Sequence, residues 1–296
     1  MPERVSISGF LNIDKPLRLT SHDVVNKIRR GLSIKKVGHA GTLDPLATGV
    51  LVICLGSATR LSEYAMNSTK CYQAIVHLGV ETTTYDAEGE ATKQRDIGHI
   101  TPDMVNEALS VFIGEIDQLP PLYSAIKKDG RKLYEIARSG QTVELTPRRV
   151  TIHSIEMRDW QPPRCVLEIT CSAGTYIRSL AHDLGLALGV GAHLAGLVRT
   201  ASGLFTLERS ASLDALLDNP DWTRFVLSSD TAVLHLPRVD LDPVDEDHVR
   251  HGRSPRSVAL AAEGFARAYA ADGALLALLQ ADDGFWKPHK VFLGEE

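Results

Sequence analysis

The chain has 296 residues, of which 44% are hydrophobic and 23% charged, the balance of a soluble globular protein with room for one large domain or a large and a small one. No run of 18 apolar residues is present, which excludes a membrane-spanning helix, and the N-terminus lacks the basic and apolar stretches of a signal peptide. The four cysteines form no CxxC pair, so we expect free thiols and a cytoplasmic location.

The charged side chains are unevenly distributed along the chain. The net charge of −5 argues mildly against a nucleic-acid partner, yet residues 1–80 carry 10 basic and 5 acidic side chains and residues 121–160 carry 8 and 5. Phosphate binding depends on the local field, so these two segments are candidates for contact with RNA. Such unevenness also arises by chance, and it does not decide the question alone.

The N-terminal third alternates between strand and helix patterns. Ser21 is the predicted N-cap of the first helix and Gly31 its end. Three glycines and a proline mark the segment after it as a loop. The predicted elements are strand 7–16, helix 22–31, loop 36–50, strand 51–56 and strand 70–79.

The middle of the chain continues with mixed elements. We expect one buried stripe on its last helix, formed by Ile177, Leu180, Ala181 and Leu184. The predicted elements are an exposed acidic loop 81–97, helix 101–114, an extended arm, basic turn and helix over 119–140, adjacent strands 150–160 and 164–172, and helix 175–189.

The composition changes after about residue 238 to an acidic, Ala-rich segment. FARAYAADGALLALLQ within it predicts two strands around an Asp-Gly turn. We therefore predict a large domain over 1–238 and a small second domain over 239–296.

Asp44 is the first candidate for chemistry. It precedes a proline, which favours an extended conformation, and it lies in a glycine-flanked loop that can approach another surface closely. A carboxylate held in this way can act as a nucleophile or a base. From Asp-Pro alone, an ordinary turn is the simpler interpretation.

Arg178 is the second candidate, because a positive charge in the first turn of a helix opposes the helix dipole. Local rules broken at one residue often mark a functional site, and Asp44 could supply its partner. A solvated surface arginine is the alternative. Tyr72 and Tyr176 could be core tyrosines or aromatic platforms for a base, and His39 an ordinary loop histidine.

Several other chemistries lack support in the sequence. No spacing of His, Cys, Asp or Glu indicates a metal site, and no Walker A loop, Rossmann fingerprint or GxSxG elbow is present.

Six stretches resemble motifs of the TruB family of pseudouridine synthases, which isomerise uridine 55 in the T-loop of tRNA. They occur in the family's order over about residues 8–205, and six ordered matches are far more specific than one. The stretches are LNIDKPLRLTSHDVV (11–25), GHAGTLDPLATGVL (38–51), KCYQA (70–74), PPLYSAIKKDGRKLYEIAR (120–138), CSAGTYIRSLAHDLG (171–185) and LAGLVRTASG (194–203).

The resemblance implies a role for each matching residue. Asp44 would be the nucleophile, Tyr72 would stack on the extruded uracil, and Arg178 would pair with Asp44 and keep it ionised. Leu197 would form a wall of the base pocket, and His39 would occupy the space that the extruded base leaves in the T-loop. Lys15 and Tyr176 would support the pocket.

The resemblance also implies an α+β fold with a mixed, largely antiparallel sheet flanked by helices, and a small PUA-like C-terminal β domain for RNA binding. That C-terminal part departs most from the family's pattern. The implied enzyme is a stand-alone bacterial type that acts on the T-arm of tRNA as a monomer, with no cofactor, metal, membrane or protein partner.

The chemistry fits these residue types. Isomerisation breaks the N1–C1′ bond and forms a C5–C1′ bond without a change of oxidation state. An ionised carboxylate can attack as a covalent nucleophile, and we expect a nearby arginine to lower its pKa. An aromatic ring can offset the cost of extruding the base, and an apolar pocket can exclude water.

Other interpretations stay open at this point. The chain could be a guide-dependent rRNA pseudouridine synthase of the archaeal and eukaryotic branch, or a non-catalytic RNA-binding or RNA-folding protein. A nucleoside hydrolase shares chemistry at C1′, but such enzymes tend to need a carboxylate cluster or a metal. The sequence leaves open whether Asp44 attacks C1′ or C6.

Overall fold

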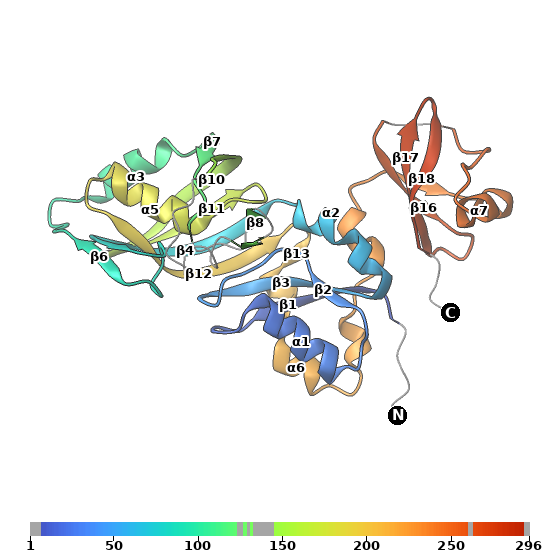
Figure 1. Cartoon of the computed structure of the whole chain (residues 1–296), viewed down its shortest axis with the longest axis horizontal. Helices are drawn as coiled ribbons and strands as arrows, with labels where there is room; N and C mark the ends of the chain where they lie inside the picture. The colour runs from blue at the N-terminus through green and yellow to red at the C-terminus, as the bar shows by residue number, and fades with distance from the viewer. Residues whose placement is uncertain (1–6, 123–126, 129–130, 133–144, 260–262, 293–296) are drawn as a thin grey trace.

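The computed structural model describes residues 7–122, 127–128, 131–132, 145–259 and 263–292. Its centre is a mixed ten-stranded sheet (Figure 1). Along its main path lie β14 (Ala211–Ser212), β1 (Gly9–Lys15), β3 (Ala47–Leu55), β12 (Ala192–Ser202), β4 (Lys70–Leu78), β11 (Arg164–Cys171), β10 (Arg148–Gln161) and β7 (Gly114–Gln118). The short strands β2 (Val37–His39) and β13 (Phe205–Thr206) pair with β3 and β12.

Strand β12 joins the two halves of this sheet. It runs parallel to β3 and antiparallel to β4, and most of the other pairs are antiparallel, as predicted. Its ladder with β4 contains two register shifts, between Leu194 and Gly196 and between Arg199 and Ala201. Each shift leaves one extra residue on β12, which is the arrangement of a β-bulge.

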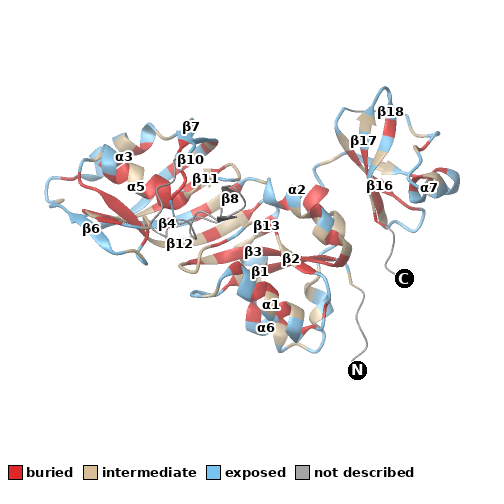
Figure 2. Cartoon of the chain, viewed as in Figure 1, coloured by how far each residue is buried: buried red, intermediate tan, exposed pale blue. Residues whose placement is uncertain are grey.

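Helices cover the two halves of the sheet separately (Figure 1). Helices α1 (Ser21–Gly31) and α6 (Leu213–Leu217) lie against the β1–β3 half, while α3 (Pro102–Ser110) and α5 (Ile177–Ala187) lie against the other. The predicted stripe of α5 is buried in a core shared with the sheet strands (Figure 2). The remaining short helices of this part are η1 (Gly56–Leu61), α2 (Ser62–Met66), η2 (Leu207–Arg209), η3 (Trp222–Phe225) and η4 (Ser229–Val233).

Two local predictions near the N-terminus are wrong. Thr20, not Ser21, caps α1, because its side chain accepts from the Asp23 amide while Asp23 reaches back in a capping box. The predicted loop 36–50 contains β2 and the first residues of β3. Both strands are hydrogen-bonded in the sheet, which overrides the glycine content of the segment.

The predicted exposed loop 81–97 is instead a hairpin of β5 (Val80–Thr82) and β6 (Ala91–Gln94) with a partly buried interior. Glu81 is buried because it pairs with Arg95 at 2.6 Å and with Lys93 at 3.3 Å. Asp86 is also buried, for reasons given below.

The basic segment after residue 119 is described only in part. The strands β8 (Lys127–Lys128) and β9 (Arg131–Lys132) form a two-stranded ladder with four basic residues, consistent with the predicted basic turn. The helix predicted after this turn lies outside the described residues.

The C-terminal residues form a separate lobe (Figure 1). Strands β16 (Phe265–Tyr269) and β17 (Leu275–Asp282) flank the predicted Asp-Gly turn, and Trp286 is buried in the lobe's own apolar core. The lobe consists of β15 (Arg238–Asp240), α7 (Pro243–Arg250), β16 (Phe265–Tyr269), β17 (Leu275–Asp282) and β18 (Phe285–Val291).

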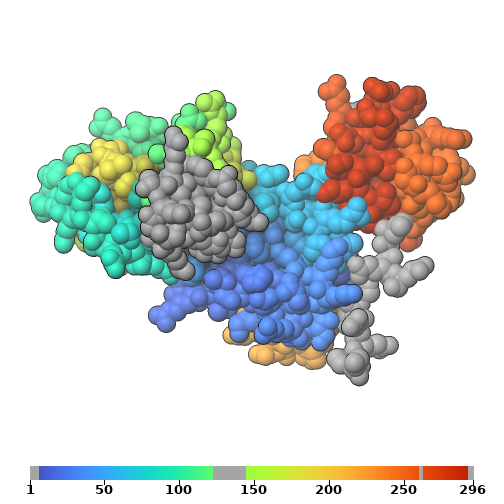
Figure 3. All heavy atoms as spheres, in the orientation of Figure 1, coloured from blue at the N-terminus to red at the C-terminus, as the bar shows by residue number. Residues whose placement is uncertain are grey.

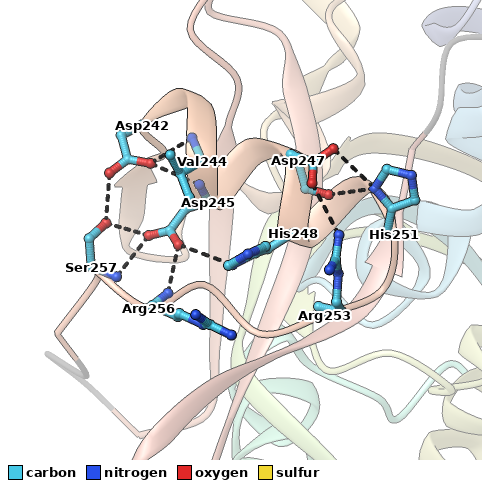
Figure 4. A network of polar contacts seen from close by, with 9 residues as sticks. All are labelled: Asp242, Val244, Asp245, Asp247, His248, His251, Arg253, Arg256 and Ser257. Atoms are coloured by element: carbon cyan, nitrogen blue, oxygen red, sulfur yellow. Dashed lines mark hydrogen bonds and ion pairs between the residues drawn. The ribbon is translucent and has the colours of Figure 1, made fainter.

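Hydrogen bonds to buried Asp245 fix the loop that follows α7 (Figure 4). Its carboxylate accepts from the amides of Arg256 at 2.7 Å and Ser257 at 2.9 Å, while Asp242 caps the helix N-terminus. The lobe packs beside α2 (Figure 3), where the rings of Tyr64 and Phe265 meet edge to face at 6.2 Å.

Candidate active site

Asp44 lies in the turn between β2 and β3, and hydrogen bonds fix this turn on two sides. Ser21, at the start of α1, donates to the Leu43 carbonyl at 3.1 Å and accepts from the Leu43 amide at 2.8 Å. The Ala47 amide donates to the Asp44 carbonyl at 3.0 Å. Gly41 has φ +100°, a conformation that favours glycine. The carboxylate is therefore carried on a short, well-anchored segment.

Arg178 lies between two carboxylates. Its Nε is 3.0 Å from Asp44 Oδ2, and its Nη1 is 3.3 Å from Asp86 Oδ2. Nη1 also donates to the Thr84 carbonyl at 3.3 Å. The Arg178 side chain is only 7% exposed, whereas that of Asp44 is 41% exposed. These contacts offset the unfavourable position of the arginine at the start of α5, and they leave Asp44 accessible to a ligand.

Asp86 is a site residue that the sequence analysis missed. Its Oδ1 accepts from the Thr84 hydroxyl at 2.5 Å and from the Glu88 amide at 3.1 Å, and its Oδ2 faces Arg178. The bond from the Glu88 amide back to the Asp86 side chain is that of an Asx turn, which is typical of a polar segment such as Thr-x-Asp-x-Glu. That turn was a usable signal, but the acidic composition around it predicted solvent exposure.

Burial raises the pKa of the Asp44 carboxyl above its usual value. The charges of Arg178 and Lys15 act in the opposite direction, and that of Asp86 acts in the same direction as burial. The expected lowering by an arginine therefore occurs, but the predicted net direction is wrong because desolvation is larger. The charge of Arg178 therefore favours the ionised form of Asp44 against the effect of burial.

A cavity of about 530 Å³ opens beside Asp44. Tyr72 on β4 and Leu197 on β12 contribute to its wall, so the structure brings these predicted residues together with Asp44 and Arg178. Tyr72 is 9% exposed. It shares a sheet face with Leu197, because Leu197 pairs with Ala74, which is two residues from Tyr72 on β4 and therefore on the same face. The cavity lining joins one carboxylate, two tyrosines and four basic side chains in one partly closed space; the basic residues are Lys70, Arg148, Arg178 and Arg199.

Tyr176 also lines this cavity, and Gln118 at the end of β7 fixes its main chain. The Tyr176 amide donates to Gln118 Oε1 at 2.8 Å, and Gln118 Nε2 donates back to the Tyr176 carbonyl at 3.0 Å. Gln118 is 2% exposed. This reciprocal pair links β7 to the start of α5 and so holds the residues just before Arg178.

Lys15 and His39 lie near the cavity but are not among its lining residues. Lys15 is buried, its Nζ donates to the carbonyls of Pro16 at 3.0 Å and Leu19 at 2.6 Å, and burial lowers its pKa to about 8. His39 is half-buried on β2, and burial lowers its pKa as well. Lys15 contributes charge toward Asp44 without lining the cavity.

Within the described ranges, no group of three His, Cys, Asp or Glu side chains is arranged to hold a metal ion. No helix among the same residues is long and apolar enough to cross a membrane. The four cysteines are free, and three of them are buried.

The residues that are present allow nucleophilic or acid–base chemistry on a planar ligand. Asp44 can attack or accept a proton, Arg178 can stabilise its charged form, and Tyr72 can stack on a flat ring.

Three family models match the chain in succession. TruB family pseudouridylate synthase (N-terminal domain) matches residues 29–177, tRNA pseudouridylate synthase B C-terminal domain matches 178–246, and tRNA pseudouridine synthase II, C-terminal, matches 236–293.

Curated relatives match over nearly the full chain. A protein of Dehalococcoides mccartyi (strain ATCC BAA-2100) is 44% identical, with 97% of both chains covered. Proteins of Thiobacillus denitrificans and Pseudomonas aeruginosa are 42% and 39% identical, with 97% or more of each chain covered. All three are named tRNA pseudouridine synthase B.

Solved structures agree with this result. A chain of a Cbf5–Nop10–Gar1 complex superposes with a TM-score of 0.74 at 29% identity, covering 96% of this chain and 85% of that one. A chain of an H/ACA ribonucleoprotein bound to a substrate RNA containing 2′-deoxyuridine gives 0.73 at 28% identity, with the same coverage.

Proposed function

The chain belongs to the TruB family of pseudouridylate synthases, and from this premise we propose that it converts uridine 55 in the T-loop of tRNA to pseudouridine, with Asp44 as the nucleophile. The observation that carries the proposal is the contact of 3.0 Å between Arg178 and Asp44 at a cavity lined by Tyr72 and Leu197. A half-exposed carboxylate held by a buried guanidinium is suited to attack a ligand that enters this cavity.

The reaction needs a held base rather than a redox partner. The N1–C1′ bond breaks, uracil rotates, and a C5–C1′ bond forms; N1 takes up a proton and the C5 proton is lost to solvent. Asp44 attacks C1′ or C6 and divides one difficult step into two easier ones. Extruding a uridine from a folded loop costs a few kcal/mol, which stacking on Tyr72 offsets.

The other residues act around this centre. Arg178 keeps Asp44 ionised, and Asp86 holds the opposite side of the guanidinium. Lys15 adds positive potential next to Asp44. Tyr176 and Leu197 limit the pocket, and His39 fills the space that the extruded base leaves in the T-loop.

The rest of the assignment follows the same premise. We expect a cytoplasmic monomer that needs no metal, cofactor or protein partner. The segment 239–296 would add a PUA-like RNA-binding module to a catalytic domain over 1–238.

The alternatives differ in testable ways. Relatives named tRNA pseudouridine synthase B are 39–46% identical, whereas the Cbf5 chain is 29% identical, which favours stand-alone action over guide-dependent modification. A non-catalytic RNA-binding protein would bind tRNA without reaction. A nucleoside hydrolase would release free uracil.

The test is tritium release from tRNA labelled at C5 of uridine. We expect the protein alone to release tritium from wild-type tRNA and not from tRNA with cytidine at position 55. Asp44→Asn should abolish release while RNA binding stays within a few-fold, because phosphate and shape contacts lie elsewhere. Turnover by the Asn variant, with deamidation excluded, would remove Asp44 from the mechanism.

A further inference from the structure

Arg199 lies at the centre of the sheet and is 1% exposed. It stands on β12 between the two segments that supply site residues, opposite Gly49 of β3 on one side and Tyr72 of β4 on the other. Its side chain reaches the wall of the Asp44 cavity. Leu197 and Val198 also pair with both strands, and Arg199 is the one of the three that lies opposite Tyr72.

The guanidinium of Arg199 binds main-chain carbonyls of the Asp44 turn and of β3. Nε donates to Val50 O at 2.7 Å, Nη2 to Gly41 O at 3.1 Å, and Nη1 to Thr42 O at 3.4 Å. Gly41 and Thr42 begin the short turn that ends in Asp44. Ser21 of α1 hydrogen-bonds the next residue, Leu43, so Arg199 and α1 bind the Asp44 turn from two sides.

Arg199 also interacts with the hydroxyl of Tyr72. Burial raises the pKa of this hydroxyl, and the interaction with Arg199 acts against that increase. Arg199 therefore hydrogen-bonds the segment that carries Asp44 and is the cross-strand neighbour of Tyr72, whose ring is proposed to hold the base.

The charge of Arg199 is not neutralised in the usual way. No carboxylate lies within 4.0 Å of it in the part of the chain that the structure describes, whereas Arg178 has two. A buried charge without a counter-ion is costly, and it is tolerated where its hydrogen bonds are satisfied. A guanidinium has five N–H donors in a fixed plane, which suits several carbonyls and a hydroxyl better than one ammonium does.

The backbone around Arg199 has little room to move. Gly49 has φ +93°, and a Cβ added there would lie 2.3 Å from the Arg199 carbonyl oxygen. A Cβ added at Gly41 would lie 3.5 Å from Nη1, which is ordinary contact. Strand β3 thus approaches the Arg199 main chain closely, whereas the turn meets the guanidinium at an ordinary contact distance.

We propose that Arg199 is a positioning residue that fixes the Asp44 turn and the Tyr72 ring in one mutual geometry. This inference rests on the proposed function for its catalytic consequence. Arg199 acts through Asp44 and Tyr72 and does not itself exchange a proton or form a bond with uracil. A displacement of about 1 Å at the reacting atoms can cost about 100-fold in rate, which is the size of effect expected.

The test compares Arg199→Met and Arg199→Lys with Arg267→Met. Arg267 is a matched control in the C-terminal lobe, since it is 16% exposed and donates to the Leu236 carbonyl and the Tyr269 hydroxyl, both at 2.9 Å. At saturating tRNA we expect Arg199→Met to lower the single-turnover rate about 100-fold with RNA affinity within a few-fold. Arg199→Lys should recover part of that rate, and Arg267→Met serves only as the control for the exchange measurement below.

Amide hydrogen exchange gives a readout that does not depend on activity. The amides of Leu43 and Ala47 are bonded inside the Asp44 turn, and they should exchange about tenfold faster in Arg199→Met but not in Arg267→Met. Should the Met variant not fold, the same comparison is made with Arg199→Lys.

Unchanged exchange at Leu43 and Ala47, or a single-turnover rate of Arg199→Met equal to that of the wild type, would overturn the proposal. A second measurement uses Tyr72→Phe: Arg199→Met should cost less in that background, and strictly additive losses would remove the link to Tyr72. If wild-type protein releases no tritium, the proposed function fails, while exchange still decides the structural role of Arg199.

Discussion

Arg178→Met should destabilise the protein as well as inactivate it. The substitution removes the only ion pair of Asp86 within the described residues, and the Asp86 side chain is 4% exposed. Removing one partner of a buried ion pair costs about 3–5 kcal/mol. Asp86 keeps its bonds from Thr84 and Glu88, and the Asp44 side chain is 41% exposed, so the lower end applies, about 3 kcal/mol.

A loss of this size corresponds to a decrease in Tm of about 6–12 °C for a chain of this size. The assay is thermal unfolding of four proteins: wild type, Arg178→Met, Asp86→Asn, and the double variant. Because the Asn side chain carries no charge to leave unpaired, the double variant should be more stable than the sum of the single losses, with a coupling of about 1–3 kcal/mol. Additive losses, or an Arg178→Met protein with an unchanged Tm, would refute the reasoning.

The remaining predictions concern pH, salt and metal. Asp44 is active as the carboxylate, which predominates above its pKa, and the charge of Arg178 lowers that pKa. Arg178→Lys, with a less well placed charge, should therefore move the acidic limb of the pH–rate profile to higher pH. An acidic limb at the same pH would contradict this. EDTA should not affect activity on pre-folded RNA when the magnesium concentration is controlled. Inhibition by EDTA that a trace divalent ion reverses would contradict the expectation that no metal is needed. Binding should weaken with salt by a log–log slope of roughly −0.7 to −0.9 per neutralised phosphate. Alanine should be placed at four basic positions together: Lys127, Lys128, Arg131 and Lys132. The variant should show a flatter salt slope with a nearly unchanged single-turnover rate, and an unchanged slope would make these residues ordinary surface charges.

The long, regular elements of the fold could be predicted from periodicity. The alternation over residues 70–79 corresponds to β4, and the apolar spacing after residue 175 corresponds to α5, with the same buried positions. Short strands in glycine-rich or acidic segments could not, because their stability comes from partners in the sheet. Such partners are distant in sequence and leave no local pattern.

The site was predictable where one residue breaks a local rule. Arg178 at a helix start pointed to a carboxylate, and Asp44 is the residue that it contacts. Arg199 gave no such signal, since an arginine in a strand ordinarily faces solvent. The net charge of residues 1–80 was also misleading as a surface property, because Lys15 and Lys70 within it are buried and bind main-chain carbonyls.

The two bulges of β12 change which of its residues share a face. Leu194, Leu197, Arg199 and Ser202 pair with alternate residues of β4, although they are spaced by three, two and three positions along β12. Each bulge absorbs one residue and resets the alternation. A one-residue insertion or deletion beyond either bulge can therefore be taken up there, without turning Leu197 and Arg199 away from the cavity. The orientation of Leu197 and Arg199 is set by residues 196–199, which lie between the two bulges. The ends of the strand can vary in length without changing it.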